Sequence, residues 1–319
     1  MRFGVLIHRS CGWAGVRNVV QRRLAMLEFC VRVPATIANL GPGFDALGLA
    51  VSVHCEARAV QGEDDAFVYN GDASAFGADN LIHQGWRAAH AALGLEAPSV
   101  HLSCENPIPL ARGLGSSSAA LVAGAALADL ALGGRLGRKG VLEVCAKLEG
   151  HPDNVAPAVL GGFTASVMGA SGETINAQFD LPPDVRVVVA VPDFELKTAD
   201  ARAALPAHYS RADMVYNLSR SALWVAAVAT GKLEWLREAC RDALHQPYRA
   251  PLVPGLEAAL ERALSSGAFA AFLSGAGPSV AALVAADTVD AVRGALATFA
   301  PRVLVLEPSP GYCEGSNGR

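Results

Sequence analysis

The chain has 319 residues, of which 52% are apolar and 18% are charged, so it can bury a large core and does not have the composition of a disordered protein. Its formal net charge of −4 and pI near 6.1 argue against nucleic acid or an anionic membrane as the main partner. No stretch of the sequence is apolar over the length that a membrane-spanning helix requires.

Residues 1–25 contain five arginines and no acidic residue. This composition fits either a transit-type targeting segment or an upstream extension, disordered or preceding a true start at Met26, and we favour the extension. The seven cysteines of the chain are scattered and never form a C-x-x-C pair. They indicate reduced thiols in a cytoplasmic protein, not a disulfide framework or a zinc site.

The first half of the chain alternates between strand and helix patterns. Residues 31–33 and 100–104 predict short strands, and residues 51–57 alternate apolar and polar side chains with the period of a strand that has one wet face. Helical spacing of apolar residues predicts a helix over residues 82–93. Residues 117–132 are Ala-rich and almost uncharged, so we expect a helix buried on most sides.

A different pattern begins at residues 185–191, which are almost all β-branched, as in a central strand buried on both faces. Apart from helices inserted within residues 212–240, the order is β-α-β-β-α-β, the split motif of ferredoxin-like domains. Its elements are predicted at residues 185–191, 255–264, 269–273, 280–284, 289–299 and 303–306. We therefore expect an α+β chain with an N-terminal domain at residues 26–182, a ferredoxin-like domain at 183–308 and a loose tail at 309–319.

Two glycine-rich loops carry polar residues between predicted strands. Residues 34–45 read Pro-Ala-Thr-Ile-Ala-Asn-Leu-Gly-Pro-Gly-Phe-Asp, and Asn39 and Asp45 are the side chains that such a loop could direct at a ligand. Residues 274–279 read Ser-Gly-Ala-Gly-Pro-Ser. Either loop, taken alone, is also explained as a simple turn.

A further glycine-rich loop, residues 109–120, runs directly into the buried helix. A helix start offers unpaired N–H groups and the positive end of the helix dipole, and Gly113 and Gly115 would let phosphate oxygens approach the backbone. The serines at residues 116–118 can cap the helix, bind phosphate or ligate Mg²⁺. This composition, with no acid nearby, favours an anion site over an ordinary capped helix.

Other glycine-rich motifs fit this loop poorly. The sequence lacks the Gly-Lys-Ser/Thr of a Walker A loop and the third glycine of a dinucleotide fingerprint. A hydrolase with Ser117 as nucleophile and Asp200 and His245 as partners is an alternative. Against it, Pro107 and Pro109 interrupt the strand that should deliver such a serine.

Charged residues stand between a predicted helix and the apolar run at residues 155–160, and others follow the buried strand at residues 185–191. Residues 147–154 read Lys-Leu-Glu-Gly-His-Pro-Asp-Asn. A phosphoryl-transfer site needs a carboxylate for Mg²⁺ and donors for the acceptor alcohol, which Glu149 and His151 could supply. Arg202 and Arg249 form a pair suited to bidentate capture of a carboxylate. A helix C-cap before a proline turn, and ordinary surface arginines, are the competing explanations.

Together these segments resemble the GHMP kinase family. The family signature P-x-x-x-G-L-G-S-S-A-A is similar to residues 109–119, which carry one extra serine. Residues 34–50, 149–157 and 274–279 are most similar to the homoserine-phosphorylating members of the family. The resemblance covers residues 30–307 and implies a ribosomal-S5-like N-terminal domain joined to the ferredoxin-like domain. It also implies transfer of phosphate from ATP, with Mg²⁺, to the hydroxyl of L-homoserine in the threonine branch of amino-acid biosynthesis, and it makes a homodimer an expectation.

The resemblance further implies roles for single residues. Ser117, or Ser118 because of the extra serine, would hold Mg²⁺ together with Glu149, and Asn154 would join them as a catalytic residue. The nucleotide would contact Pro109, Leu110, Ala111, Arg112, Gly113, Leu114, Gly115, Ser116, Ser117, Ser118 and Ala119. The substrate would contact Asn39, Asp45, His151, Thr198, Arg202 and Arg249. The last family motif corresponds to Ser274, Gly275, Ala276 and Gly277. The charges agree with these roles, because Asp45 suits an ammonium group and the arginines suit a carboxylate.

No dedicated base stands out near the acceptor in the sequence, so we expect catalysis to rest on positioning and electrostatic stabilisation. Two further alternatives stay open. One is a GHMP kinase with a different alcohol as substrate, and the other is a nucleotide-binding regulator without turnover.

Overall fold

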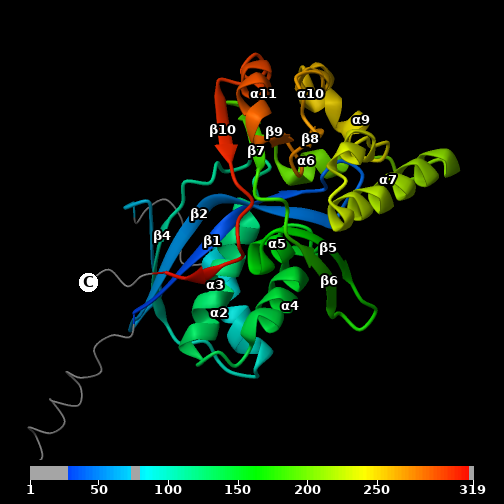
Figure 1. Ribbon diagram of the computed structural model, residues 1–319. Helices are drawn as coiled ribbons and strands as arrows, with labels where there is room; N and C mark the ends of the chain where they lie inside the picture. The colour runs from blue at the N-terminus through cyan, green and yellow to red at the C-terminus, as the bar shows by residue number, and fades with distance from the viewer. Residues whose placement is uncertain (1–27, 73–79, 316–319) are drawn as a thin grey trace, which may run out of the picture.

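The computed structural model describes residues 28–72 and 80–315, and the extension predicted at residues 1–25 lies outside them. Within this part of the chain, the strands form two sheets, with α10 and α11 at one end of the molecule and α2, α3 and α4 at the other (Figure 1). Among the described residues, no helix has the length and apolar character needed to cross a membrane.

The first sheet, as far as it is described, has the strand order β11-β1-β2-β4-β3, and β5 and β6 branch from β2. Its strands are β1 (Glu28–Ala38), β2 (Leu47–Gln61), β3 (Ala66–Tyr69), β4 (Val100–Glu105), β5 (Phe163–Met168), β6 (Thr174–Phe179) and β11 (Cys313–Glu314). The antiparallel ladder of β1 and β2 shifts register between Pro34 and Ala35. Proline has no N–H to donate to a ladder, which suits it to such an irregularity.

Helices cover one face of this sheet. They are α2 (Leu81–Ala92), α3 (Ser116–Ala131), α4 (Gly137–Glu149) and α5 (Val155–Leu160). The Ala-rich α3 is buried along most of its length, as its composition predicts. Glycines let α2 approach it closely: a Cβ on Gly124 would lie 1.9 Å from the carbonyl oxygen of Ile82, and one on Gly85 would lie 2.2 Å from that of Leu121.

The second sheet has the order β10-β7-β9-β8 in the described chain, with every neighbouring pair antiparallel. Its strands are β7 (Val185–Val191), β8 (Ala270–Leu273), β9 (Val280–Ala285) and β10 (Arg302–Leu306). The helices of this half are α6 (Thr198–Ala203), α7 (Arg211–Thr230), α8 (Leu236–Ala239), α9 (Gln246–Arg249), α10 (Leu256–Ser265) and α11 (Val289–Leu296), with 3₁₀ turns η1 (Leu233–Trp235), η2 (Ala250–Leu252) and η3 (Ala286–Thr288). Strand order and connectivity are those of the predicted split motif, so the α+β fold class is confirmed.

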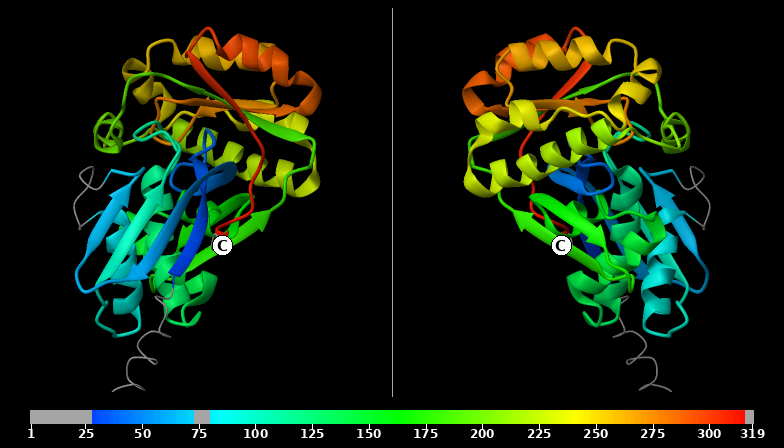
Figure 2. Two further views of the ribbon diagram at one scale, coloured as in Figure 1. Left: turned by 90° about the vertical axis from the view of Figure 1, so that its left-hand side faces the viewer. Right: turned by 90° about the vertical axis from the view of Figure 1, so that its right-hand side faces the viewer.

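Helix α7 lies between the two sheets (Figure 2). Its Trp224 is fully buried, stacks on Phe163 of β5 with ring centroids 5.4 Å apart, and meets the edge of Phe272 of β8 at 6.2 Å. One aromatic side chain therefore links the cores of both sheets. We propose the domain boundary at residues 182–183, between β6 of the first sheet and β7, the first strand of the second.

Parts of the fold differ from the sequence-based expectation. The hairpin of β5 and β6 was not predicted, because its outward face carries both polar and apolar side chains and so lacks a clear period. The tail expected to be loose from residue 309 is instead held against the first sheet as far as residue 315. Tyr312 is buried, its N–H donates to the Ala158 carbonyl at 2.8 Å, and Arg138 donates to its carbonyl at 2.7 Å. A single buried aromatic residue among prolines and glycines leaves no periodic signal in the sequence.

Candidate active site

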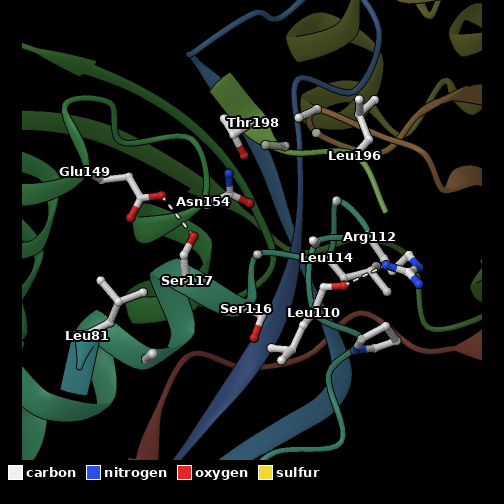
Figure 3. A pocket seen from close by; sticks show the side chains of 18 of the residues that line it. Leu81, Leu110, Arg112, Leu114, Ser116, Ser117, Glu149, Asn154, Leu196 and Thr198 are labelled. Atoms are coloured by element: carbon white, nitrogen blue, oxygen red, sulfur yellow. Dashed lines mark hydrogen bonds between the residues drawn. The ribbon is translucent and has the colours of Figure 1, made fainter. Parts of the chain in front are cut away.

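A cavity of about 470 Å³ lies where the three glycine-rich loops meet (Figure 3). It is lined by all six residues expected to contact a substrate, namely Asn39, Asp45, His151, Thr198, Arg202 and Arg249. Glu149, Asn154 and most of the 109–119 loop also line it. Of the residues to which the family resemblance gives a role, three do not line the cavity, namely Ser118, Ala119 and Ser274.

The 109–119 loop owes its shape to two glycines with positive φ. Gly113 has φ +74° and Gly115 has φ +66°, a conformation that residues with a Cβ rarely adopt. A Cβ on Gly113 would lie 2.1 Å from the Ser274 carbonyl oxygen, and one on Gly115 would lie 1.9 Å from Thr36 Oγ1. Gly115 is also the N-cap of α3 and has no side chain with which to bond the first N–H groups of the helix. This helix start is therefore open to an anion in the cavity.

Oxygen ligands suited to a divalent cation stand beside this helix start. Ser117 Oγ donates a hydrogen bond to Glu149 Oε1 at 3.3 Å, and Figure 3 shows the two side chains facing each other. Burial raises the pKa of Glu149, although the nearby His151 and the serine hydroxyls oppose this effect. A half-buried carboxylate among hydroxyls is a hard-oxygen site of the kind Mg²⁺ prefers, and bound positive charge would relieve the cost of its burial.

Thr36 supports the site through its contacts, and sequence reasoning missed it. Its Oγ1 donates to Asn154 Oδ1 at 2.8 Å, and its N–H donates to the Leu114 carbonyl at 3.1 Å. It thereby orients the Asn154 amide and fastens the 109–119 loop to β1. The sequence gives no signal for this contact, because the two side chains are 118 residues apart.

Charges of both signs lie at the other end of the cavity. Arg202 donates to both carboxylate oxygens of Asp45, at 2.7 and 3.1 Å, and ligand atoms of Asp45, His151 and Asp153 lie within 4.8 Å of one another. His151 Nδ1 lies 2.5 Å from Asp153 Oδ1. Burial lowers the pKa of His151, but the Asp153 hydrogen bond and the charge of Asp45 outweigh burial and raise it overall. Paired charges of this kind suit a small zwitterion.

Arg249 is more deeply placed than Arg202, with only 2% of its surface exposed. Its guanidinium donates to the carbonyl oxygens of Ala201, at 3.1 Å, and Gly275, at 3.0 Å. Burial, reinforced by the charge of Arg202, lowers its pKa to about 10. A buried cation that borders a cavity is a favourable site for an anionic group.

Arg112 does not face the middle of the cavity, although it belongs to the predicted nucleotide loop. Its Nε donates to the Pro192 carbonyl at 2.9 Å and its Nη2 to the Asp193 carbonyl at 2.6 Å, and Figure 3 shows the side chain turned away from Ser117. Arg112 therefore ties the loop to the segment that follows β7.

The hydrolase alternative is not supported. Ser117 contacts Glu149, whereas His245 is bonded to the Gly41 carbonyl and to Arg249. The Ser-His contact that such a nucleophile requires is therefore replaced by other partners.

Sequence reasoning also missed an apolar part of the cavity, apart from Leu110 of the 109–119 loop. This part is lined by Phe67, Tyr69, Leu81, Cys104, Asn106 and Leu110. Its walls come from β3, β4, α2 and the 109–119 loop, and they suit a flat heterocycle. The only local signal is Asn80, whose side chain accepts from the N–H groups of Ile82 and His83 and caps α2 at the edge of this region.

Comparisons with known proteins identify the class to which this fold and site belong. The model of the GHMP kinases N terminal domain matches residues 80–162, and that of the GHMP kinases C terminal domain matches residues 224–302. A crystal structure of homoserine kinase from Cytophaga hutchinsonii superposes with a TM-score of 0.81 at 26% identity, covering 90% of this chain and 97% of that one. A mevalonate diphosphate decarboxylase from Enterococcus faecalis, at 16% identity and TM-score 0.71, covering 92% of this chain and 100% of that one, shares the fold. The architecture is that of a GHMP kinase.

Relatives with similar sequences show which family of GHMP kinases this chain belongs to. The chain is 56% identical to a homoserine kinase of Thermus thermophilus over 88% of its length and 96% of the relative's. It is 43% identical to one from Gloeobacter violaceus, over 90% and 95% of the two chains. The chain therefore belongs to the homoserine kinase family of the GHMP kinases.

Proposed function

We propose that this protein transfers the terminal phosphoryl group of ATP to the side-chain hydroxyl of L-homoserine and forms O-phospho-L-homoserine, a step of threonine biosynthesis. One observation supports this proposal above the others. The Ser117–Glu149 pair at the start of α3 and the Asp45, Arg202 and Arg249 charges border the same cavity, so a phosphate-binding end and an amino-acid-binding end meet in it.

The amino-acid end is matched to a zwitterion. Asp45 and Arg202 pair with each other in the structure, and both are partly exposed to the cavity. A ligand with an ammonium group and a carboxylate can replace this pair with one contact to each residue, at little electrostatic cost. Arg249 would share the carboxylate, and Asn39 and His151 would contact the amino and hydroxyl ends.

The phosphate end is matched to a nucleotide with a divalent cation. The start of α3 would receive phosphate oxygens, and the apolar wall around Phe67 and Leu81 would receive the base. Glu149 and Ser117 would hold Mg²⁺, which supplies positive charge against the phosphate oxygens when bound.

Catalysis in this proposal rests on the chain's fixed dipoles and on orientation. The helix start and Asn154 hold the phosphoryl group, while Asp45 and the arginines hold the alcohol in line with it. The alcohol proton leaves late in a loose transition state, to an oxygen of the transferred phosphoryl group or to water, so no single side chain acts as an essential base. The enzyme is proposed to be cytoplasmic, with no nucleic-acid or membrane partner. Size-exclusion chromatography tests the expected homodimer.

The first test is ADP release with Mg·ATP against L-homoserine, mevalonate, galactose, L-serine and L-threonine. Turnover with L-homoserine in strong preference to the others is the expected result. Preference for another alcohol would overturn the substrate assignment, and nucleotide binding without turnover on any alcohol would favour a regulator.

A further inference from the structure

His245 connects the buried Arg249 to the first glycine-rich loop. Its Nδ1 lies 3.2 Å from Arg249 Nη1, and its Nε2 lies 2.7 Å from the Gly41 carbonyl oxygen. The ring is fully buried, and it packs 5.5 Å from the ring of Phe44. Neither contact is visible in the sequence as a motif, and the function proposed above does not use this residue.

The hydrogen-bond partners of the His245 ring specify one tautomer, and the Asp242 carboxylate, with Oδ2 3.5 Å from Nε2, favours the same one. A guanidinium can only donate hydrogen bonds, so Nδ1 must accept from Arg249. A carbonyl can only accept, so Nε2 must carry the proton that it donates to Gly41. The imidazole is therefore neutral, with its proton on Nε2. Burial lowers the pKa of His245 and Arg249 lowers it further, while Asp242 opposes them, so the direction agrees with a neutral ring.

The contacts of His245 place it between two of the glycine-rich loops. Through Gly41 it reaches the loop that carries Asn39 and Asp45. Through Arg249 it reaches the 274–277 loop, because the Gly275 carbonyl accepts from both Arg249 Nη1 and Asn39 Nδ2, each at 3.0 Å. A displaced imidazole would therefore move the arginine and both loops relative to one another.

A carboxylate fixes the position of His245 itself. Asp242, whose side chain is 0% exposed, accepts from the backbone N–H of His245 at 2.9 Å and from Asn217 Nδ2 at 3.0 Å. Asn217 in turn donates to the Pro42 carbonyl at 3.0 Å. The space is tight as well, since a Cβ on Gly41 would lie 2.2 Å from the Cys240 carbonyl oxygen. The backbone of His245 and the Gly41 loop that its ring contacts are thus both held in place.

We propose that His245 is a positioning residue for the amino-acid substrate: as a neutral imidazole protonated on Nε2, it aligns Arg249 with the loop that carries Asn39 and Asp45. The inference rests on the proposed function, because it takes the ligand of Arg249 to be the substrate carboxylate. His245 touches no reacting atom in this scheme, and its effect is on substrate affinity.

Two substitutions separate the two hydrogen bonds. The side-chain oxygen of Asn is as many bonds from Cβ as Nδ1 is, so His245→Asn keeps an acceptor for Arg249 and loses the donor to Gly41. The amide nitrogen of Gln is as many bonds from Cβ as Nε2 is, so His245→Gln keeps the donor to Gly41 and loses the acceptor for Arg249. His90→Gln is the matched control, since His90 is buried (3% exposed) on α2 and bonds the Trp86 carbonyl away from the cavity.

The kinetic measurement is KM for L-homoserine and for ATP in the full-length chain and the three variants. Loss of a hydrogen bond to a charged donor predicts that His245→Gln raises KM for L-homoserine by about 10-fold and leaves KM for ATP within about twofold. His245→Asn should raise KM for L-homoserine less than His245→Gln does, and His90→Gln should change neither constant. Equal effects of both His245 variants on both KM values, or no effect of either, would overturn the proposal.

A second measurement does not depend on turnover. Long-range ¹H–¹⁵N spectra of the imidazoles, with the His245 signals assigned by their loss in His245→Asn, should show a pyrrole-type Nε2 and a pyridine-type Nδ1 near neutral pH. A doubly protonated ring, or the proton on Nδ1, would refute the role of His245 even in an active enzyme. If the wild-type chain fails to phosphorylate L-homoserine but shows the Nε2–H tautomer, the fault lies in the proposed substrate and not in the alignment of Arg249.

Discussion

Glu149 shows at the scale of one residue how function and stability oppose each other. Burial raises its pKa, so the folded state holds its proton more tightly than the unfolded state does. Stability is therefore lost as pH rises through the unfolded and then the folded pKa, and this loss is the cost of burying the charged form. Glu149→Gln removes that cost, and we expect it to raise Tm by roughly 1–3 °C without Mg²⁺. The same change should lower kcat by at least about 100-fold.

Glu143→Gln on the same helix is the control for both effects, because Glu143 pairs weakly with Lys139 at 3.9 Å outside the cavity. Differential scanning fluorimetry with and without Mg·ATP and the ADP-release assay give the two readouts. Wild type should gain stability from Mg·ATP and Glu149→Gln should gain much less. Equal stabilisation of both proteins would contradict the assignment of Glu149 as a cation ligand.

The neighbouring serines of the loop differ in their surroundings. Ser117 borders the cavity and bonds Glu149, whereas Ser118, whose hydroxyl also opposes the rise in the pKa of Glu149, is fully buried. We expect Ser117→Ala to raise the Mg²⁺ concentration needed for half-maximal activity by about 10-fold, on the scale of losses at metal-site residues, and Ser118→Ala to raise it less. A Mg²⁺ titration of both variants at saturating substrates decides between them. The reverse order would make Ser118 the ligand, and the family signature would then align with this loop one residue further along the chain.

At the scale of an element, the start of α3 depends on Gly115. A side chain there would be strained at φ +66° and would meet Thr36 Oγ1 at 1.9 Å. We expect Gly115→Ala to raise KM for ATP by roughly 10-fold or more, because the first turn of the helix and Asn154 must both shift. Gly133→Ala is the matched control, since Gly133 has φ +72° but no neighbour within 4 Å of its Cβ position. It adds the same backbone strain without the collision.

Comparison of these two variants separates strain from contact. If both raise KM for ATP equally, general strain explains the effect and the close approach of Gly115 to Thr36 is irrelevant to binding. Thermal melts run beside the kinetics show whether either chain has lost its fold.

At this scale the sequence could predict the features that depend on local composition, and it could not predict contacts between residues far apart in the chain. The strand β7 and the helix α3 were predictable from their composition. A run of valines favours a strand buried on both faces, and a run of alanines favours a buried helix. The loops were predictable because glycines such as Gly113 and Gly115 can take the positive φ that a tight loop requires, which other residues rarely adopt. The supporting contacts were not. Thr36 with Asn154, His245 with Gly41, and Arg112 with the segment after β7 join residues far apart in the chain, and a polar side chain alone does not indicate its partner.

The same reasoning explains the elements that were missed. In the β5–β6 hairpin, Val167 and Ile175 are cross-strand neighbours that remain more than half exposed, so the hairpin has no clean alternation of apolar and polar residues. The strand β3 is short and half-buried, and its pairing with β4 is parallel and non-local. Such elements are defined by their neighbours more than by their own composition.

At the scale of the whole molecule, the chain returns to its starting sheet after completing the second one. The N–H of Gly162 donates to the Ser309 carbonyl at 2.9 Å, and β11 pairs with β1. The two halves of the fold are thus connected by two covalent crossings, one before β7 and one after β10, by Trp224 and by Arg112. This bracing suits a site whose lining comes from both halves, because a relative shift of the sheets would separate Arg202 and Arg249 from the start of α3.

Tyr312 allows the contribution of the returning segment to be measured apart from catalysis. Its ring is 8% exposed and lies under the Arg138 guanidinium, 4.5 Å from the centroid, at a distance from the cavity lining. Removing a buried aromatic ring predicts that Tyr312→Ala lowers Tm by roughly 4–8 °C, while Tyr312→Phe, which keeps the ring beneath Arg138, should change it by less than about 2 °C. Both variants should keep the wild-type kcat at 25 °C, where each remains folded. A Tyr312→Ala protein with the wild-type Tm would show that the segment around Tyr312 contributes little to stability. A large loss of kcat in a folded variant would show instead that this segment affects the geometry of the active site.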